Sequence, residues 1–173
     1  MALRTLRLLV PVLWIVGAVP SALACRISDP PSADAMVARA DLILRATAVD
    51  YSIAPSSNTR TTGVPETRVR FRVESVEKGT YTAPELILPG YLSNQDDWND
   101  QAPPYPMVRR NGRSGSCYAN TYRQGAQFLL VLRRTSGEIY TVNWYALGPV
   151  NEQLRSPNDP WLVWVREQLK ARE

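Results

Sequence analysis

An alternation of side chains along residues 67 to 77 restricts the fold more than any other feature of this sequence. Three apolar residues alternate there with three basic ones: Val69, Phe71 and Val73 with Arg68, Arg70 and Arg72. Because successive side chains of a strand point to opposite faces, the pattern predicts a strand with one buried and one exposed face. The alternation slips at Val76, which predicts a β-bulge before a turn at Lys78-Gly79.

Other stretches have the composition of strands and of two helices. Apolar or β-branched runs predict further strands at 41–51, 85–88, 127–133 and 138–145, the last two as a hairpin. Ser32 is a candidate N-cap for a short helix over 32–40. Asp159 and Pro160 open a longer amphipathic helix whose apolar residues include Trp161, Val165 and Leu169. About five antiparallel strands at this spacing close most easily into a small barrel, because closure removes exposed edges.

The segment 93–116 has almost no apolar periodicity and predicts a long surface loop. Its three aspartates, Asp96, Asp97 and Asp100, lie close together in the sequence. Their spacing does not match a calcium loop, which needs regular ligands and a terminal glutamate. We therefore interpret them as a solvated acidic loop rather than as a metal site or a glycosidase pair.

The first 24 residues have the layout of a secretory signal peptide. Arg4 and Arg7 precede an apolar run over 8–19, and Ala22 and Ala24 supply the small residues of a cleavage site after Ala24. The run is too short to span a bilayer, which takes about 20 residues, and no later stretch is apolar enough. We expect a secreted or periplasmic chain with a single domain over 25–173 and no transmembrane segment. Cleavage lowers the net charge from +4 to +2, so a nucleic-acid partner is not expected.

Two cysteines, Cys25 and Cys117, are the only ones in the sequence. In an oxidising compartment the simplest prediction is one disulfide bond between them. The alternative is a lipoprotein anchored through Cys25, which would consume its thiol. Lipid-attachment sites usually place leucine three residues before the cysteine, whereas this chain has Ala22. The sequence before Cys25 therefore favours ordinary cleavage.

The sequence contains no histidine. Catalytic systems that use Ser-His-Asp or Cys-His are therefore excluded, and so is zinc bound by histidine. We predict that the chain is not an enzyme and has no cofactor and no metal of its own.

The order of these features resembles the inhibitory domain of the tissue inhibitors of metalloproteinases, a netrin-like module. Four segments carry the resemblance: Cys25 followed by Pro30-Pro31, ADLILRA (40–46), VRFRVESVEKGTY (69–81) and SCYANTYRQGAQFLLVLRRTSGEIYTV (116–142). Together they cover most of residues 25 to 150. The resemblance implies an OB-fold barrel of five antiparallel strands, with a short helix before it and an amphipathic helix after it. The missing further cysteines and missing second domain fit the reduced, single-domain relatives found in bacteria.

The resemblance also implies a mechanism. Cys117 matches the family's partner of the amino-terminal cysteine, which implies a Cys25–Cys117 disulfide. The α-amino nitrogen and carbonyl oxygen of Cys25 would chelate the zinc of a metalloprotease, and Arg26 would enter its specificity pocket. Gly115 and Ser116 would form a neighbouring contact ridge. The family usually has a small or hydroxylated residue in place of Arg26 and a bulkier residue in the ridge.

A second class of function is a binding module without protease targets. OB barrels often bind sugars or polyanions on one face. Six arginines are candidates for a basic surface that binds a polyanion or a component of the cell envelope: Arg68, Arg70, Arg72, Arg109, Arg110 and Arg113.

Overall fold

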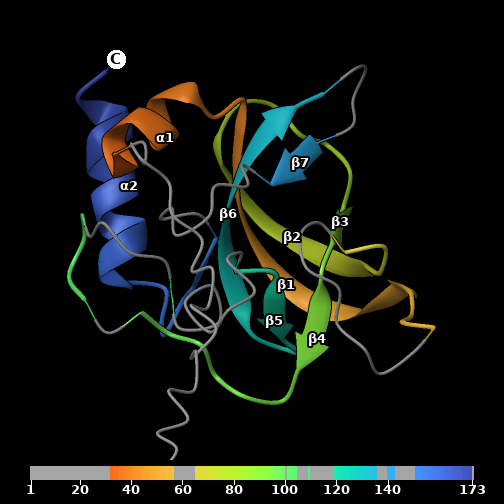
Figure 1. The fold of residues 1–173 in the computed structure, drawn as a ribbon. Helices are drawn as coiled ribbons and strands as arrows, with labels where there is room; N and C mark the ends of the chain where they lie inside the picture. Colours follow the sequence, from red (N-terminus) through yellow and green to blue (C-terminus); the bar gives the residue numbers. More distant parts are fainter. Residues whose placement is uncertain are drawn as a thin grey trace, which may run out of the picture.

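The structure, a computed structural model, describes residues 32–56, 65–99, 101–104, 109, 119–135, 140–142 and 151–172. Its largest sheet has the strand order β3-β2-β1-β6-β7, and each ladder along this path is antiparallel (Figure 1). The bounds are β1 Leu42–Ile53, β2 Arg68–Lys78, β3 Glu85–Pro89, β6 Gln127–Arg134 and β7 Tyr140–Val142. A short strand, β8 (Glu152–Gln153), also pairs with β6. The predicted mostly β fold, with a five-stranded antiparallel sheet and two helices, is confirmed.

Strand β1 is apolar almost throughout its first half because both of its faces are buried. Its even-numbered residues from Leu42 to Ala48 lie in a core enclosed by β1, β2, β3 and β6. Ile43 points the other way, into a second core beneath the helices. Strand β6 divides in the same manner, with Phe128 in the first core and Leu129 in the second. The two cores therefore share β1 and β6 as a common wall.

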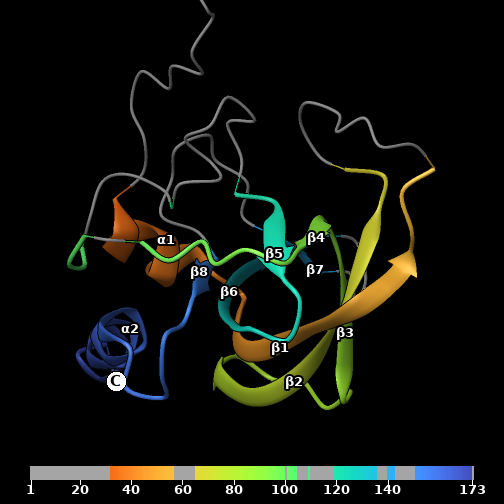
Figure 2. The ribbon, with the colours of Figure 1, turned by 90° about the horizontal axis from the view of Figure 1, so that it is seen from below.

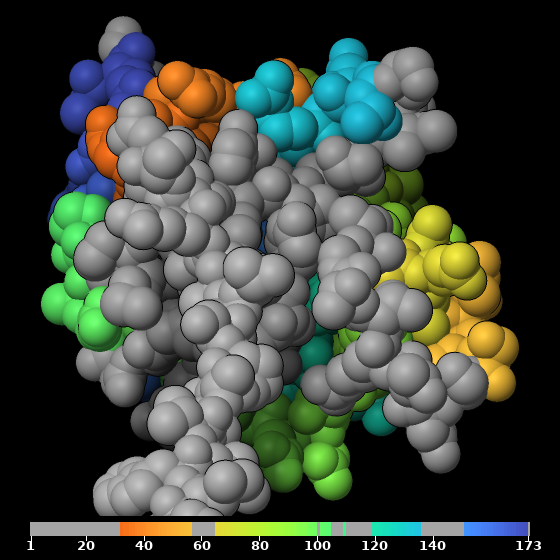
Figure 3. All heavy atoms as spheres, viewed as in Figure 1, coloured from red at the N-terminus to blue at the C-terminus, as the bar shows by residue number. Residues whose placement is uncertain are grey.

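Two helices cover the second core and lie together on one side of the sheet (Figure 2). Helix α1 (Ala33–Arg39) follows Ser32, as predicted, although the Ser32 side chain makes no capping hydrogen bond. Helix α2 (Pro160–Lys170) begins after Asp159, whose carboxylate accepts a hydrogen bond from the Trp161 amide at 2.9 Å. In the space-filling view, α1 (orange) and α2 (dark blue) are in contact (Figure 3).

The predicted bulge in β2 is present. Ile43 pairs with Lys78, but the next residue, Leu44, pairs with Val76, so Glu77 is the extra residue. Gly79 follows with φ +82°, and a Cβ atom there would collide with the Asp41 carbonyl oxygen. The Lys78 ammonium group donates to the carbonyls of Val37 and Ala38, at 3.0 and 2.9 Å, in the last turn of α1. The bulge region thereby attaches β2 to α1.

The described residues of the predicted loop 93–116 include buried polar side chains. They begin at the end of β4 (Tyr91–Ser93), which forms a separate parallel pair with β5 (Thr121–Arg123). Within the described part of 93–116, Asp97, Asn99 and Arg109 are buried. The sequence offers no apolar periodicity there because polar contacts, rather than an apolar face, hold the described residues of this segment in place.

Candidate functional site

All residues of the predicted inhibitory site lie outside the described residues. These are Cys25 and Arg26, the predicted ridge at Gly115 and Ser116, and Cys117. The same applies to Arg110 and Arg113 of the predicted basic surface, and to residues 1–24. Four candidates are described: Arg68, Arg70, Arg72 and Arg109.

Arg109 is fully buried, so its assignment to an exposed basic surface was wrong. Its guanidinium group donates to four oxygens: Asn151 O (2.6 Å), Asp97 Oδ2 (2.7 Å), Thr121 O (2.8 Å) and Ala119 O (2.9 Å). A buried arginine is tolerated only when its charge is paired and its donors are satisfied, and these contacts meet both conditions. We call this cluster the Arg109 hub.

The hub joins three parts of the chain that are far apart in the sequence. Asp97 follows β4, Thr121 begins β5, and Asn151 precedes β8. The bond from Arg109 to the Ala119 carbonyl also ties together two residues that flank the stretch 110–118. That stretch contains the predicted ridge and Cys117. The hub therefore links the two described residues, Arg109 and Ala119, that lie on either side of this candidate inhibitory segment.

Aromatic rings surround the hub on the core side. The guanidinium carbon of Arg109 lies 5.4 Å from the ring centroid of Tyr122 and 5.2 Å from that of Phe128, within the range of cation–π attraction. The Tyr122 hydroxyl accepts a hydrogen bond from Asn151 Nδ2 at 3.2 Å. Burial raises the pKa of Tyr122 to about 12, although the charge of Arg109 opposes this. Tyr122 is therefore a neutral structural residue at physiological pH.

Asn151 is a part of the hub that sequence reasoning missed. It is fully buried and adopts a left-handed conformation with φ 51°, which asparagine tolerates better than most residues. Its Oδ1 accepts from the Val131 amide at 3.2 Å, so it attaches the hub to β6. The only signal in the sequence is an isolated asparagine between predicted elements, which is too weak to identify it.

The three arginines of β2 are paired rather than free. Arg68 Nη1 donates to the carbonyls of Pro65 and Glu66, each at 2.7 Å. Arg70 forms an ion pair with Asp50 at 3.3 Å, and Arg72 forms one with Glu74 at 3.0 Å. Each charged partner reduces the local positive potential. Two of the three positive charges on this face of β2 are therefore paired with carboxylates.

The acidic cluster is also paired. Asp97 is buried against Arg109, and Asp96 pairs with Arg123 and accepts from Gln153 Nε2 at 2.6 Å. The interpretation of a solvated acidic loop is thus wrong for Asp97, because its ion pair with the buried Arg109 offsets the cost of desolvating the carboxylate. Asp100 lies outside the described residues. Within the described part of the chain, no three cysteine, aspartate or glutamate side chains are grouped to hold a metal ion.

The comparisons with known proteins do not add to these observations. No protein-family model matches the chain, and no curated protein matches it. Among the described residues, no helix has the length and apolar character needed to cross a membrane.

Proposed function

We propose that the chain is an exported inhibitor of zinc metalloproteases that resembles the tissue inhibitors of metalloproteinases. In this proposal residues 1–24 are removed and Cys25 becomes the first residue. Its α-amino nitrogen and carbonyl oxygen bind the catalytic zinc of the protease in place of the water at the open coordination position. A free α-amino group has a pKa of about 7.7–8.0, so deprotonating it to bind metal near neutral pH costs little.

The strand order is the observation that supports this proposal most. A path β3-β2-β1-β6-β7 becomes a five-stranded barrel when its two end strands meet. Cα atoms of β3 and β7 approach within 8 Å of each other, although no ladder between them occurs among the described residues. This arrangement suits a partly open OB-like barrel, and α2 follows the sheet as the resemblance implies.

The Arg109 hub supports the location of the inhibitory surface. A protease inhibitor gains affinity when its contact segment is held in place before binding, because less conformational entropy is then lost. Arg109 and Ala119 flank the stretch that carries Gly115, Ser116 and Cys117, and their hydrogen bond holds the base of that stretch. A Cys25–Cys117 disulfide would fix the amino terminus to the same base.

The charge of Arg26 predicts the kind of specificity pocket that the target protease has. A charged side chain is costly to bury in an apolar pocket. The proposed target is therefore a metalloprotease whose specificity pocket is polar or acidic, and an Arg26→Thr variant should shift inhibition toward proteases with apolar pockets.

The test uses the exported, processed chain against a panel of zinc metalloproteases. We expect measurable inhibition, and the addition of one alanine before Cys25 should abolish it, because the added residue displaces the amine from the zinc. Mass spectrometry of the mature protein provides the control, since it establishes whether the amino terminus is a free Cys25 or an acylated one. Equal inhibition by the processed and extended proteins would refute the zinc-chelating mechanism, and acylated Cys25 would identify a lipoprotein.

The alternative of a polyanion-binding module receives less support. Arg109 is buried, and the described arginines of β2 are held by carboxylates or backbone carbonyls. Retention on a heparin-like column that is lost in modest salt would favour this alternative.

A further inference from the structure

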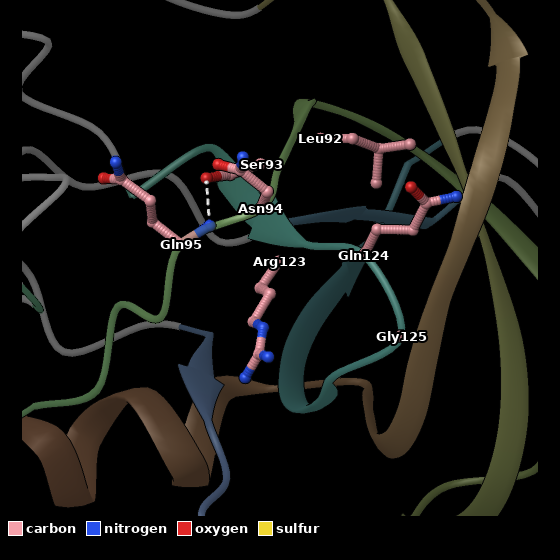
Figure 4. Close-up of a pocket in the computed structure, with 7 residues that line it drawn as sticks. All are labelled: Leu92, Ser93, Asn94, Gln95, Arg123, Gln124 and Gly125. Carbon is pink, nitrogen blue, oxygen red and sulfur yellow. Dashed lines mark hydrogen bonds between the residues drawn. The ribbon is translucent and has the colours of Figure 1, made fainter.

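A polar cavity opens between the end of β4 and the turn that connects β5 to β6. Its volume is about 850 Å³, it is wide open to solvent, and it is lined by residues 92–95 and 123–125 (Figure 4). This volume lies within the range of about 300–1,000 Å³ that is usual for small-molecule sites. Its lining is mainly amide, hydroxyl and guanidinium groups, so it does not suit an apolar ligand.

The two walls of the cavity are held together by main-chain hydrogen bonds. The Gln124 amide donates to the Ser93 carbonyl at 2.9 Å, which joins the turn to β4. The Gly125 amide donates to the Ala48 carbonyl of β1 at 2.8 Å, and Gly125 has φ +79°. On the other wall, Ser93 Oγ accepts from the Gln95 amide at 3.0 Å. The cavity is therefore formed before any ligand binds, which lowers the entropic cost of binding.

Two side chains of the cavity are oriented by groups outside it. Gln124 Nε2 donates to the Val49 carbonyl at 2.8 Å, which leaves the Gln124 amide oxygen as an acceptor. The Arg123 guanidinium is paired through Nη1 with Asp96, which itself accepts from Gln153. Because Asp96 balances the charge of Arg123, the described lining of the cavity has little net charge. The N–H groups of Arg123 other than those on Nη1 can donate hydrogen bonds to a neutral ligand.

We propose that this cavity binds a neutral oligosaccharide that carries acetamido groups. A sugar hydroxyl both donates and accepts, which matches a lining of amide and guanidinium groups without net charge. The partly buried side chain of Leu92, which packs against the sheet core, and the amide of Gln124 both line the cavity, while Arg123 points another way (Figure 4). An acetamido group presents a methyl for Leu92 and an N–H for the Gln124 oxygen. A cavity of about 850 Å³ has room for a chain of sugar units rather than one unit.

The test is a titration of the ¹⁵N-labelled processed protein with N,N′,N″-triacetylchitotriose, followed by amide correlation spectra. We expect saturable shifts confined to the amides of residues 92–95 and 123–125, and to the side-chain amides of Asn94 and Gln124. Maltotriose, which has hydroxyls but no acetamido groups, should bind more weakly. A sulfated heparin tetrasaccharide should not bind more tightly, because Asp96 offsets Arg123.

Two variants of the lining and one matched control complete the experiment. Asn94→Ala and Arg123→Ala should each weaken binding by about threefold to tenfold, the usual effect of one lost hydrogen bond. Asn158→Ala removes an exposed amide that is not among the lining residues and should leave binding unchanged. The proposal is overturned if triacetylchitotriose causes no saturable shifts, if the shifts map elsewhere, or if only the sulfated sugar binds. Because the assay does not involve Cys25, its result is independent of the protease inhibition proposed above.

Discussion

At the scale of single residues, Arg109 shows how a charge can organise a region that lacks an apolar face. Its side chain has no exposed surface, yet every polar contact described for it goes to an oxygen of a different residue. Three of the four oxygens belong to the main chain. Arginine suits this role because its planar group presents five donors in fixed directions and remains charged at any physiological pH.

We predict that Arg109→Met lowers the free energy of unfolding by about 3–5 kcal/mol, because Asp97 would be left buried without its cation. Urea denaturation measures the loss. A double variant with Asp97→Asn should recover part of it, since the unpaired charge is then removed. Arg72→Met, at a side chain that is 61% exposed, serves as the control and should change stability by less than about 0.5 kcal/mol. A loss below about 1 kcal/mol for Arg109→Met would contradict the hub.

At the scale of elements, the bulge in β2 connects the sheet to both helices. The extra residue, Glu77, accepts two hydrogen bonds from Arg166 of α2, at 2.8 and 3.0 Å, and one from Ser75 at 2.7 Å. Burial alone would raise the pKa of the Glu77 carboxyl, but the bonds from Arg166 and Ser75 outweigh burial and lower it. The regular alternation of β2 is therefore interrupted where the strand must reach the helices.

The lowered pKa of Glu77 predicts a pH-dependent contribution to stability. A carboxyl whose pKa is lower in the folded state stabilises the fold at pH values above its pKa in the unfolded chain, which is near 4.5. This contribution is lost as the pH falls through the pKa of the folded state. We expect Glu77→Gln to lower the free energy of unfolding at pH 7 by about 1 kcal/mol or less, because Arg166 is 43% exposed. Denaturant unfolding from pH 7 to pH 2 should show this difference shrinking below pH 4.5. A difference that is constant over this range would contradict the assignment.

At the scale of the whole molecule, β1 and β6 bind the two apolar cores into one structure. Leu44 belongs to the core enclosed by the sheet, while its neighbour Ile43 belongs to the core beneath α1 and α2. On the side where the two cores meet, both are formed by the same two strands, β1 and β6. Loss of packing in one is therefore expected to loosen the other.

We predict that Leu44→Ala lowers the free energy of unfolding by about 2–5 kcal/mol. We also expect slowly exchanging amides in β2 and in α2 to lose the same amount of protection, because both unfold together. Native-state hydrogen exchange measures both at once, with Val163→Ala, at an exposed position of α2, as the control. Protection retained in α2 but lost in β2 would show that the helices fold independently of the sheet core.

Sequence reasoning located the regular elements well and the polar cluster poorly. The alternation of Val69 and Phe71, the slip at Val76 and the cap at Asp159 are local signals, and each led to the correct element. The strands β4, β5 and β8 were missed because they are two or three residues long. Arg109 was misassigned because its basic, glycine-rich surroundings are typical of an exposed loop.

The sequence by itself determined the β class, the two helices and the absence of histidine chemistry. These follow from side-chain periodicity, capping residues and composition, which act over a few neighbouring positions. Only the tertiary structure decided which charges are exposed. Asp97, Arg109 and Asn151 are separated by up to 54 positions in the chain, and their burial depends on contacts that form once β4, β5 and β8 are in place. Because the cost of burying a charge depends on its partners rather than on its neighbours in sequence, no local pattern reveals it.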